Sequence, residues 1–357
     1  MKLKEIHKKV PKKKNRGFYL LGFIISLYFF ILSITIIVHS FSLMGESLFN
    51  ITKNDLDPLN ALGIGWLLTL IMQSSGAAAS GLMALSHAGV IGTGILIYMI
   101  IGTRIGTTIT ALVVSLLIPA KRRDFRHGFE IGLANLVFAF PIVIVMFLIE
   151  FFFSFFSNAG EYFSGINTSF SIGFIEVITI PVIEILGFVP LYLLGILGVL
   201  LLIISLRKMP DFMFELWGRD YVKKQMNKYM DKKTFSFFAG LLISILLAST
   251  TTTITLLIPL IVSRVMNLKK VIPYIIGTNL GGVIDILITG LVIGSSAIPA
   301  VFTYVSFSLI GLLWLLNTNL LFNITKSISK RTLHVSRKRA FYFLIGFILL
   351  SVILSFA

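Results

Sequence analysis

Long apolar runs alternate with short polar segments along almost the whole chain. Several of these runs reach or approach the roughly 20 residues that an α-helix needs to cross a bilayer. The uninterrupted ones cover residues 18–42, 128–153, 171–206, 297–322 and 340–357. The first run is longer than the apolar part of a signal peptide, so we expect it to remain as a helix. The pattern predicts an all-α polytopic membrane protein.

Two further apolar runs are interrupted by small and polar side chains. Residues 61–88 contain Gln73–Ser80 (QSSGAAAS), and residues 89–120 contain Gly102–Thr107 (GTRIGT). A polar, glycine-containing stretch within a membrane is tolerated only where it faces protein or a cavity. We therefore predict a re-entrant helical hairpin over 61–88 and a broken transmembrane helix over 89–120.

The same two patterns return in the second half of the chain. Residues 235–262 contain Ala248–Thr253 (ASTTTT), which predicts a second hairpin. Residues 271–294 contain Gly277–Gly282 (GTNLGG), which predicts a second broken helix. Both patterns are displaced by 175 residues from their counterparts. A single Ser/Thr-rich patch can arise by chance, but two patterns at one displacement indicate an internal repeat.

The basic residues predict how the helices are oriented. Of 31 Lys and Arg, 29 lie in five segments that flank the apolar runs, at 2–16, 121–126, 207–233, 264–270 and 326–339. Such segments face the cytoplasm, which puts the N-terminus inside and suits the cell (plasma) membrane. The ends of the first hairpin then lie outside and those of the second inside. The two repeats are therefore predicted to have inverted topology, as in many secondary transporters.

These predictions divide the chain into six parts. In order they are a basic cytoplasmic tail (1–17), a first inverted repeat (18–153), an outer loop with a connecting membrane helix (154–206), a cytoplasmic linker (207–234), a second inverted repeat (235–322), and a basic loop with a C-terminal helix (323–357). Within the third part, the loop is expected at 154–170. Pro181 and Pro190 allow a short interfacial piece before the spanning helix.

Composition argues against several other functions. The chain has no cysteine, which excludes disulfides and thiolate metal sites. Its five histidines show no ligand spacing, so no metal beyond sodium is expected. Topology explains the net charge of +16, which leaves lipids rather than nucleic acid as expected partners. The chain has no nucleotide motif and no Ser-His-Asp order, so neither an enzyme nor a cofactor is expected.

The paired motifs resemble the type II sodium/phosphate cotransporter family. In that family a Gln-Ser-Ser hairpin and a Gly-Thr-Asn-Ile-Gly-Thr segment occur in each of two inverted halves, and the resemblance here covers about residues 60–300. It implies that the hairpins meet near the membrane centre and bind phosphate and sodium. The chain departs from the family pattern at Ala248, where Gln is expected, and at Arg104, where Asn is expected. Gly282 replaces the last Thr of the second loop.

The resemblance assigns candidate site residues by position. Those implied for the phosphate or a similar anion, with Arg104 added, are Gln73, Ser74, Ser75, Arg104, Ser249 and Thr250. Those for the coupling cation, with Asp285 added, are Thr103, Thr251, Thr278, Asn279 and Asp285. Hydroxyls and half-helix N-termini donate to an oxyanion, whereas hydroxyl oxygens and exposed carbonyls coordinate sodium. The alternative is that these small residues only let the helices approach closely.

Two charged residues sharpen the hypothesis. A guanidinium at mid-membrane is costly, so a function is the default expectation for Arg104. It either grips phosphate in a bidentate manner or supplies permanently the charge of a sodium ion. The structural alternative is that it caps helix carbonyls or pairs with Glu176 or Glu184. Asp285 either binds the coupling cation or a proton, partners Arg104, or lines a hydrated cavity.

The function predicted from the sequence is sodium-coupled symport of inorganic phosphate by alternating access. Within the transporter class, another small oxyanion or coupling to protons is the alternative. A second class is a membrane protein of the same fold that senses an anion without transporting it. The oligomeric state, the coupling ratio and the direction of transport are left open by the sequence.

Overall fold

A computed structural model describes residues 16–44, 56–117, 122–165, 173–217, 232–255, 257–258, 268–333 and 337–356. These residues form helices joined by short turns, without a β-strand among them. Seven helical stretches within this part of the chain are long and apolar enough to cross a membrane. The all-α polytopic prediction is confirmed at this level. Residues 1–15 of the basic tail and half of the linker (218–231) lie outside the described residues.

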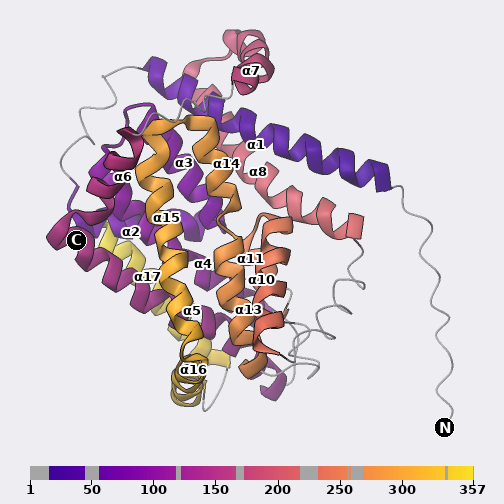
Figure 1. Ribbon diagram of the computed structural model, residues 1–357, viewed down its shortest axis with the longest axis vertical. Coiled ribbons are helices and arrows are strands. Elements are labelled where there is room, and N and C mark those ends of the chain that lie inside the picture. The colour runs from indigo at the N-terminus through magenta and orange to yellow at the C-terminus, as the bar shows by residue number, and fades with distance from the viewer. Residues whose placement is uncertain are drawn as a thin grey trace.

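The first half begins with five helices, shown in indigo to magenta in Figure 1. They are α1 (Arg16–Met44), α2 (Pro58–Met72), α3 (Ser75–His87), α4 (Thr93–Leu117) and α5 (Arg122–Phe153). The connecting part that follows contains α6 (Phe155–Gly165), α7 (Gly173–Ile185), the 3-10 turn η2 (Leu186–Phe188) and α8 (Leu191–Trp217).

The second half, orange to yellow in Figure 1, is also helical. It contains α10 (Lys233–Leu247), α11 (Thr250–Thr255), α13 (Leu268–Gly281), α14 (Ile284–Ile293), η3 (Ser295–Ala297), α15 (Ile298–Gly311), η4 (Leu312–Leu315), α16 (Thr318–Leu333) and α17 (Arg337–Phe356).

Each predicted hairpin region contains a helix that stops and restarts. The α2 helix ends where Gln73 takes the left-handed conformation with φ 56°, and α10 ends where Ala248 does so with φ 45°. Side chains bearing a Cβ avoid this conformation, so both turns are held by their surroundings. Ser74 then caps α3, because its hydroxyl accepts from the Ala77 N–H at 3.2 Å. Ser249 accepts in the same way from the Thr252 N–H at 3.2 Å.

The helix predicted to be broken at 102–107 is continuous, so this prediction was wrong. The α4 helix runs without interruption from Thr93 to Leu117. Its glycines serve packing instead, because a Cβ on Gly102 would collide with the Leu62 carbonyl of α2. In the second half the interruption does occur, but at the very end of the motif, between the end of α13 at Gly281 and the start of α14 at Ile284.

Three loop predictions also differ from the structure. Residues 155–165 are helical (α6), because the Glu150 carboxylate accepts the Phe156 N–H at 2.7 Å and so caps this helix. The linker predicted from 207 is helical as far as Trp217, since α8 continues past the apolar run. The basic loop predicted from 323 is helical to Leu333 within α16. The loop boundaries were predicted from where the long apolar runs end, and helices with polar, exposed residues continue beyond those ends.

The close approaches of the helices repeat at the displacement seen in the sequence. A Cβ on Gly65 would collide with the Met99 carbonyl, and a Cβ on Gly240 with the Tyr274 carbonyl, so α2 contacts α4 as α10 contacts α13. Both residues of the second pair lie 175 positions after those of the first. The repeat extends to α1 and α8, which begin at Arg16 and Leu191 and lie side by side (Figure 1). The sequence analysis had not paired these two helices.

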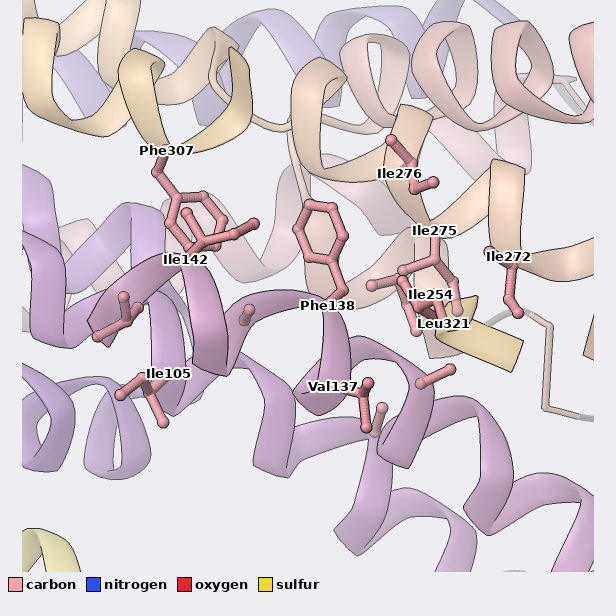
Figure 2. Close-up of a cluster of buried hydrophobic side chains, with 14 of the residues drawn as sticks. Ile105, Val137, Phe138, Ile142, Ile254, Ile272, Ile275, Ile276, Phe307 and Leu321 are labelled. Atoms are coloured by element: carbon pink, nitrogen blue, oxygen red, sulfur yellow. The ribbon is translucent and has the colours of Figure 1, made fainter. Parts of the chain in front are cut away.

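The main apolar core lies between the two halves. Figure 2 shows side chains of α4 and α5, including Ile105, Phe138 and Ile142, that lie opposite side chains of the later helices. The rings of Phe138 (α5) and Phe307 (α15) meet edge to face at 5.9 Å. This packing fixes α15 against the first half, and α15 carries the aromatic residues of the site described next.

Candidate functional site

The two helix interruptions converge inside the molecule. Ala248, at the second turn, belongs to the same buried apolar cluster as Met72, Ala77 and Ala78 around the first turn. Small side chains on α3 make this approach possible. The turn residues that the sequence placed in two distant segments are thus brought to one region, with α4 packed against both α3 and α11.

The first turn carries two of the predicted anion-site residues. Gln73 is half-buried, and its Nε2 donates to the Leu70 carbonyl of its own helix at 2.8 Å. Arg207 of α8 donates to the Met72 carbonyl at 3.2 Å, which places a cation at the C-terminus of α2. Ser74 is half-buried and serves as the N-cap of α3. Both side chains are therefore engaged locally, at the edge of the converging turns.

Ser75 leads from this turn to the centre of the site. It is 4% exposed, and its hydroxyl forms a hydrogen bond of 3.1 Å with the hydroxyl of Tyr304 on α15. The Tyr304 ring in turn lies under the guanidinium of Arg104, whose Cζ is 4.2 Å from the ring centroid. One predicted anion residue is thereby linked to another through an aromatic residue about 230 positions later in the chain.

Arg104 is buried, with 2% of its surface exposed. Its Nη2 donates to Oδ1 of Asn279 at 3.3 Å, and its Cζ also lies 4.3 Å from the centroid of the Phe307 ring. Its Nε and Nη1 have no hydrogen-bond partner among the described residues. Nor does any carboxylate of those residues form an ion pair with it; the ion pairs found there centre on Glu130. A buried cation of this kind is expected to attract an anion.

Of the two acids suggested as structural partners of Arg104, only the side chain of Glu184 is described, and it does not fill that role. Glu184 is exposed on α7, and the side chain of Glu176 lies outside the described residues. Asp285 is closer: it is 4% exposed on α14 and interacts electrostatically with Arg104 and Tyr304. Its Oδ1 accepts the Ile286 N–H at 2.8 Å. Asp285 is thus near Arg104 without forming an ion pair with it.

Asp285 also faces the start of α3. A Cβ built on Gly76 would fall on the Oδ2 atom of Asp285, so only glycine allows this approach. The N-terminus of α3, with its partial positive charge, therefore lies against a carboxylate. Ser80 of α3 and Thr289 of α14 share a hydrogen bond of 2.6 Å one turn or so further on. These contacts tie the first hairpin to the second half.

Asn279, the predicted cation ligand on α13, is held from several sides. Its Nδ2 donates to Asn135 Oδ1 at 3.0 Å and to the Ile275 carbonyl at 2.9 Å. These bonds turn Oδ1 toward Arg104. Ser308 of α15 donates to the backbone carbonyl of Asn279 at 2.8 Å. The amide oxygen that would coordinate a cation is therefore already accepting a hydrogen bond from a guanidinium.

The remaining candidates differ in their hydrogen-bond partners. Thr103 is fully buried and donates to the Ile100 carbonyl of its own helix at 2.7 Å. Ser249 donates to Thr252 Oγ1 at 2.9 Å, and Thr251 is half-buried on α11. Thr250 and Thr278 are buried, and neither hydroxyl has a hydrogen-bond partner among the described residues. A Cβ on Gly282 would fall on Thr250 Oγ1, which shows how closely α11 approaches the end of α13.

The unpartnered buried atoms concentrate at the predicted site. Six buried side-chain N or O atoms lack a hydrogen-bond partner in the described part of the chain, and four of them belong to Arg104, Thr250 and Thr278. Buried polar groups in folded proteins are normally satisfied. Their concentration on residues chosen for ligand binding therefore favours a binding site over simple helix packing.

Three residues of the site were missed by the sequence analysis. Tyr304 and Phe307 form the aromatic face under Arg104, and Asn135 of α5 orients Asn279. No local pattern marks them, because each lies on an apolar helix whose neighbours resemble it. Only their spacing on α15, three positions apart and therefore on one helix face, indicates that Tyr304 and Phe307 act together.

The arrangement as a whole is that of a membrane protein with a buried polar site between two related halves. A family model described as Na+/Pi-cotransporter matches residues 29–177 and 201–354 of the chain. The chain belongs to this family of transporters. The resemblance drawn from the paired motifs is thereby confirmed, and the chain is a multi-pass membrane protein.

Curated relatives match over part of the chain. The Sodium-dependent phosphate transport proteins 2B of Homo sapiens and Pongo abelii are each 32% identical over 140 residues, which is 38% of this chain and 20% of theirs. The Sodium-dependent phosphate transport protein 2A of Oryctolagus cuniculus is 30% identical over 128 residues, or 35% of this chain and 20% of that protein. The match thus spans about a fifth of the length of these relatives. No solved structure matches the chain.

Proposed function

We propose that the protein is a sodium-coupled symporter of inorganic phosphate that works by alternating access. Membership of the Na+/Pi-cotransporter family and the names of the curated relatives support phosphate and sodium as the transported pair. The observation that carries the proposal is Arg104, a buried cation with two nitrogens that lack a partner among the described residues, on a helix (α4) that packs against α3 and α11. Such a group suits an anion that must be bound away from water.

The transport cycle follows from two repeats of inverted topology. In this proposal α2–α3 and α10–α11 are re-entrant hairpins that enter the membrane from opposite sides. The protein lies in the plasma membrane, and its N-terminus lies in the cytoplasm. The equal displacement of the hairpins, of α1 and α8, and of the glycine contacts supports a pseudo-twofold relation. Rocking of one repeat against the other would then expose the same site to each side in turn.

Phosphate would be bound by donors from both halves. Arg104 supplies charge and hydrogen bonds, and hydroxyls of Ser75 and Thr250 lie on helices that meet there. Gln73, Ser74 and Ser249 lie at the converging turns, where small rotations of side chains bring further donors to an anion. Each of these bonds is reversible, which suits a carrier rather than a catalyst.

Sodium would be bound by oxygen atoms of the same helices. The strongest candidates are the carboxylate of Asp285, which forms no ion pair among the described residues, and the hydroxyl of Thr278, which has no hydrogen-bond partner among them. Thr103 and Thr251 offer further hydroxyl oxygens, and Asn279 offers its amide oxygen only if Arg104 moves away. Hard cations prefer such oxygen ligands.

Uptake of labelled phosphate into proteoliposomes tests the proposal. We expect uptake driven by an inward sodium gradient for the wild type and a loss of most uptake for Gln73→Ala. Lys330→Gln, which removes an exposed cation of α16, is the matched control and should transport normally. If a proton gradient without sodium drives uptake equally well, protons and not sodium are the coupling ion. Absence of uptake under every gradient, from folded protein, would contradict phosphate transport and favour an anion sensor.

A further inference from the structure

Positions 104 and 279 are counterparts that contact each other. They are 175 residues apart, the displacement that relates the two halves, and Arg104 Nη2 lies 3.3 Å from Asn279 Oδ1. The first half therefore presents a positive charge where the second half presents an amide oxygen. An amide oxygen can coordinate a cation, whereas a guanidinium only donates and repels cations. At equivalent positions, the first half thus carries a group that repels cations and the second half a group that can coordinate one.

The charge of Arg104 is held in place rather than neutralised. Two aromatic rings, Tyr304 and Phe307, lie within 4.3 Å of its Cζ, which stabilises a cation without cancelling it. Its hydrogen bond to Asn279 goes to a neutral amide, and its Nε and Nη1 have no hydrogen-bond partner among the described residues. An anion that enters the site before sodium has bound thus meets a guanidinium that forms no ion pair among the described residues, although Asp285 interacts with it electrostatically.

Asn279 is held so that this arrangement persists. Its Nδ2 is fixed by Asn135 and by the Ile275 carbonyl, which leaves Oδ1 pointed at the guanidinium. A sodium ion at Oδ1 would have to displace Arg104 and would lie beside a buried like charge. The place is consequently closed to a second cation while Arg104 occupies it.

We propose, on the basis of the phosphate symport inferred above, that Arg104 takes the place of one coupling cation. The guanidinium is a resident charge that prepares the site for an oxyanion, so phosphate binds without sodium. The mobile sodium is left to the oxygens around Asp285 and Thr278 and serves to drive the conformational change. The protein then moves one sodium fewer per phosphate than the same site would with Asn at position 104.

Equilibrium binding of labelled inorganic phosphate to the purified full-length protein in detergent tests this inference. Sodium is replaced by N-methyl-D-glucamine in one arm and kept in the other. The wild type should bind phosphate in both arms. Arg104→Asn, which makes the position identical to its counterpart, should lose affinity about 10-fold or more without sodium and recover much of it with sodium. The Hill coefficient for sodium in uptake should rise in this variant.

Two further variants separate charge from geometry. Arg104→Lys keeps the charge but loses the planar fork, so it should retain sodium-free binding with weaker affinity. Lys330→Gln, which removes an exposed charge on α16, should leave both arms unchanged and controls for net charge. Size-exclusion profiles and melting curves establish that each variant is folded. If Arg104→Asn does not fold, the wild type and Arg104→Lys still decide the question.

The outcomes distinguish this inference from the proposed function. A wild type that binds phosphate only with sodium would overturn the inference, even if sodium-driven uptake is intact. Folded Arg104→Asn protein that binds no phosphate in either arm would also overturn it, since sodium would then be unable to replace the charge of Arg104. Sodium-free binding with no uptake under any gradient would refute symport, and with it the coupling role of Arg104, and would leave only its part in sodium-independent phosphate binding.

Discussion

The two helix interruptions have the same backbone but different side-chain support. Gln73 and Ala248 both take the left-handed conformation, and a serine caps the helix after each. At the first turn the Gln73 side chain donates to Leu70, and Arg207 donates to the Met72 carbonyl. At the second turn a methyl group replaces the Gln side chain, and the Ala248 N–H bonds the Ile245 carbonyl at 3.2 Å. The shape of the turn is thus independent of the side chain that occupies it.

The neighbouring helices show the same division between shape and chemistry. Backbone contacts of α2 with α4 recur between α10 and α13, although Arg104 faces Asn279 across the two halves. Glycines set the repeated part, because the contacting atoms are backbone atoms. A few polar side chains set the part that differs. Substitutions at the backbone contacts should therefore have equal effects on stability in the two halves. Substitutions of site residues should have unequal effects.

The largest effect is expected from valine at the glycine contacts. In Gly102→Val and Gly277→Val the new side chain would meet the carbonyls of Leu62 and Phe237. Overpacking against backbone that cannot yield should destabilise each protein by about 3 kcal/mol or more. Loss of the monodisperse size-exclusion peak, or a strongly lowered melting temperature, is the readout.

The control for this pair lies on the same helix as Gly102. A Cβ added to Gly94 of α4 would meet no atom within 4 Å, so Gly94→Val should melt near the wild type. A large loss for one of the two contact glycines and none for the other would break the equivalence of the halves.

Smaller effects on stability are expected at two site hydroxyls, and the two substitutions should differ in direction. Ser75→Ala leaves the buried Tyr304 hydroxyl without the partner it has at 3.1 Å, which should cost about 1–3 kcal/mol of stability. Thr250→Val removes a hydroxyl that has no described partner, so the ligand-free protein should be as stable as the wild type or slightly more so. Both variants should bind phosphate more weakly.

Thermal melting with and without phosphate measures both quantities. Thr250→Val should lose the phosphate-induced rise in melting temperature while keeping the ligand-free value. A Thr250→Val protein that is destabilised without phosphate would show that the hydroxyl has a structural role, and the comparison of the two halves would have to be revised.

The smallest effect is expected from glycine at the two turns. Ala248→Gly relieves a left-handed conformation that costs about 1 kcal/mol, so it should raise stability by up to that amount. Gln73→Gly gains the same relief but loses the bond to the Leu70 carbonyl, which is worth about 1 kcal/mol, so its net change should be near zero. Chemical denaturation of the two variants side by side provides the measurement; equal gains in both would mean that the Gln73 bond contributes nothing.

The sequence was sufficient for the features that depend on local pattern. Apolar length located the spanning helices, and the patches at Gln73 and Ala248 located the two interruptions. It failed at α4, because glycine in a helix indicates either a break or a close contact, and only the neighbour at Leu62 distinguishes them. It failed at α6 because the cap comes from Glu150 rather than from a local serine or threonine.

The site was predicted in part for a similar reason. Arg104 stood out because a charge within an apolar run is rare, and its counterpart Asn279 followed from the repeat. The aromatic residues Tyr304 and Phe307 were out of reach, since their role depends on how α15 packs against α4. A sequence repeat shows which residues of the two halves correspond. It does not show which residues of a helix outside the repeated motifs contact them, and this is known only from the folded structure.

The contact between positions 104 and 279 restricts how this protein can be assembled. If two identical copies of the first half paired as a homodimer, each would bring Arg104 to the place where the other has it, and two buried guanidinium groups would meet. Arginine at this position is compatible only with two halves that differ in sequence, as they do in this chain. Splitting the gene into two identical modules could therefore never reproduce this site, although two different modules could.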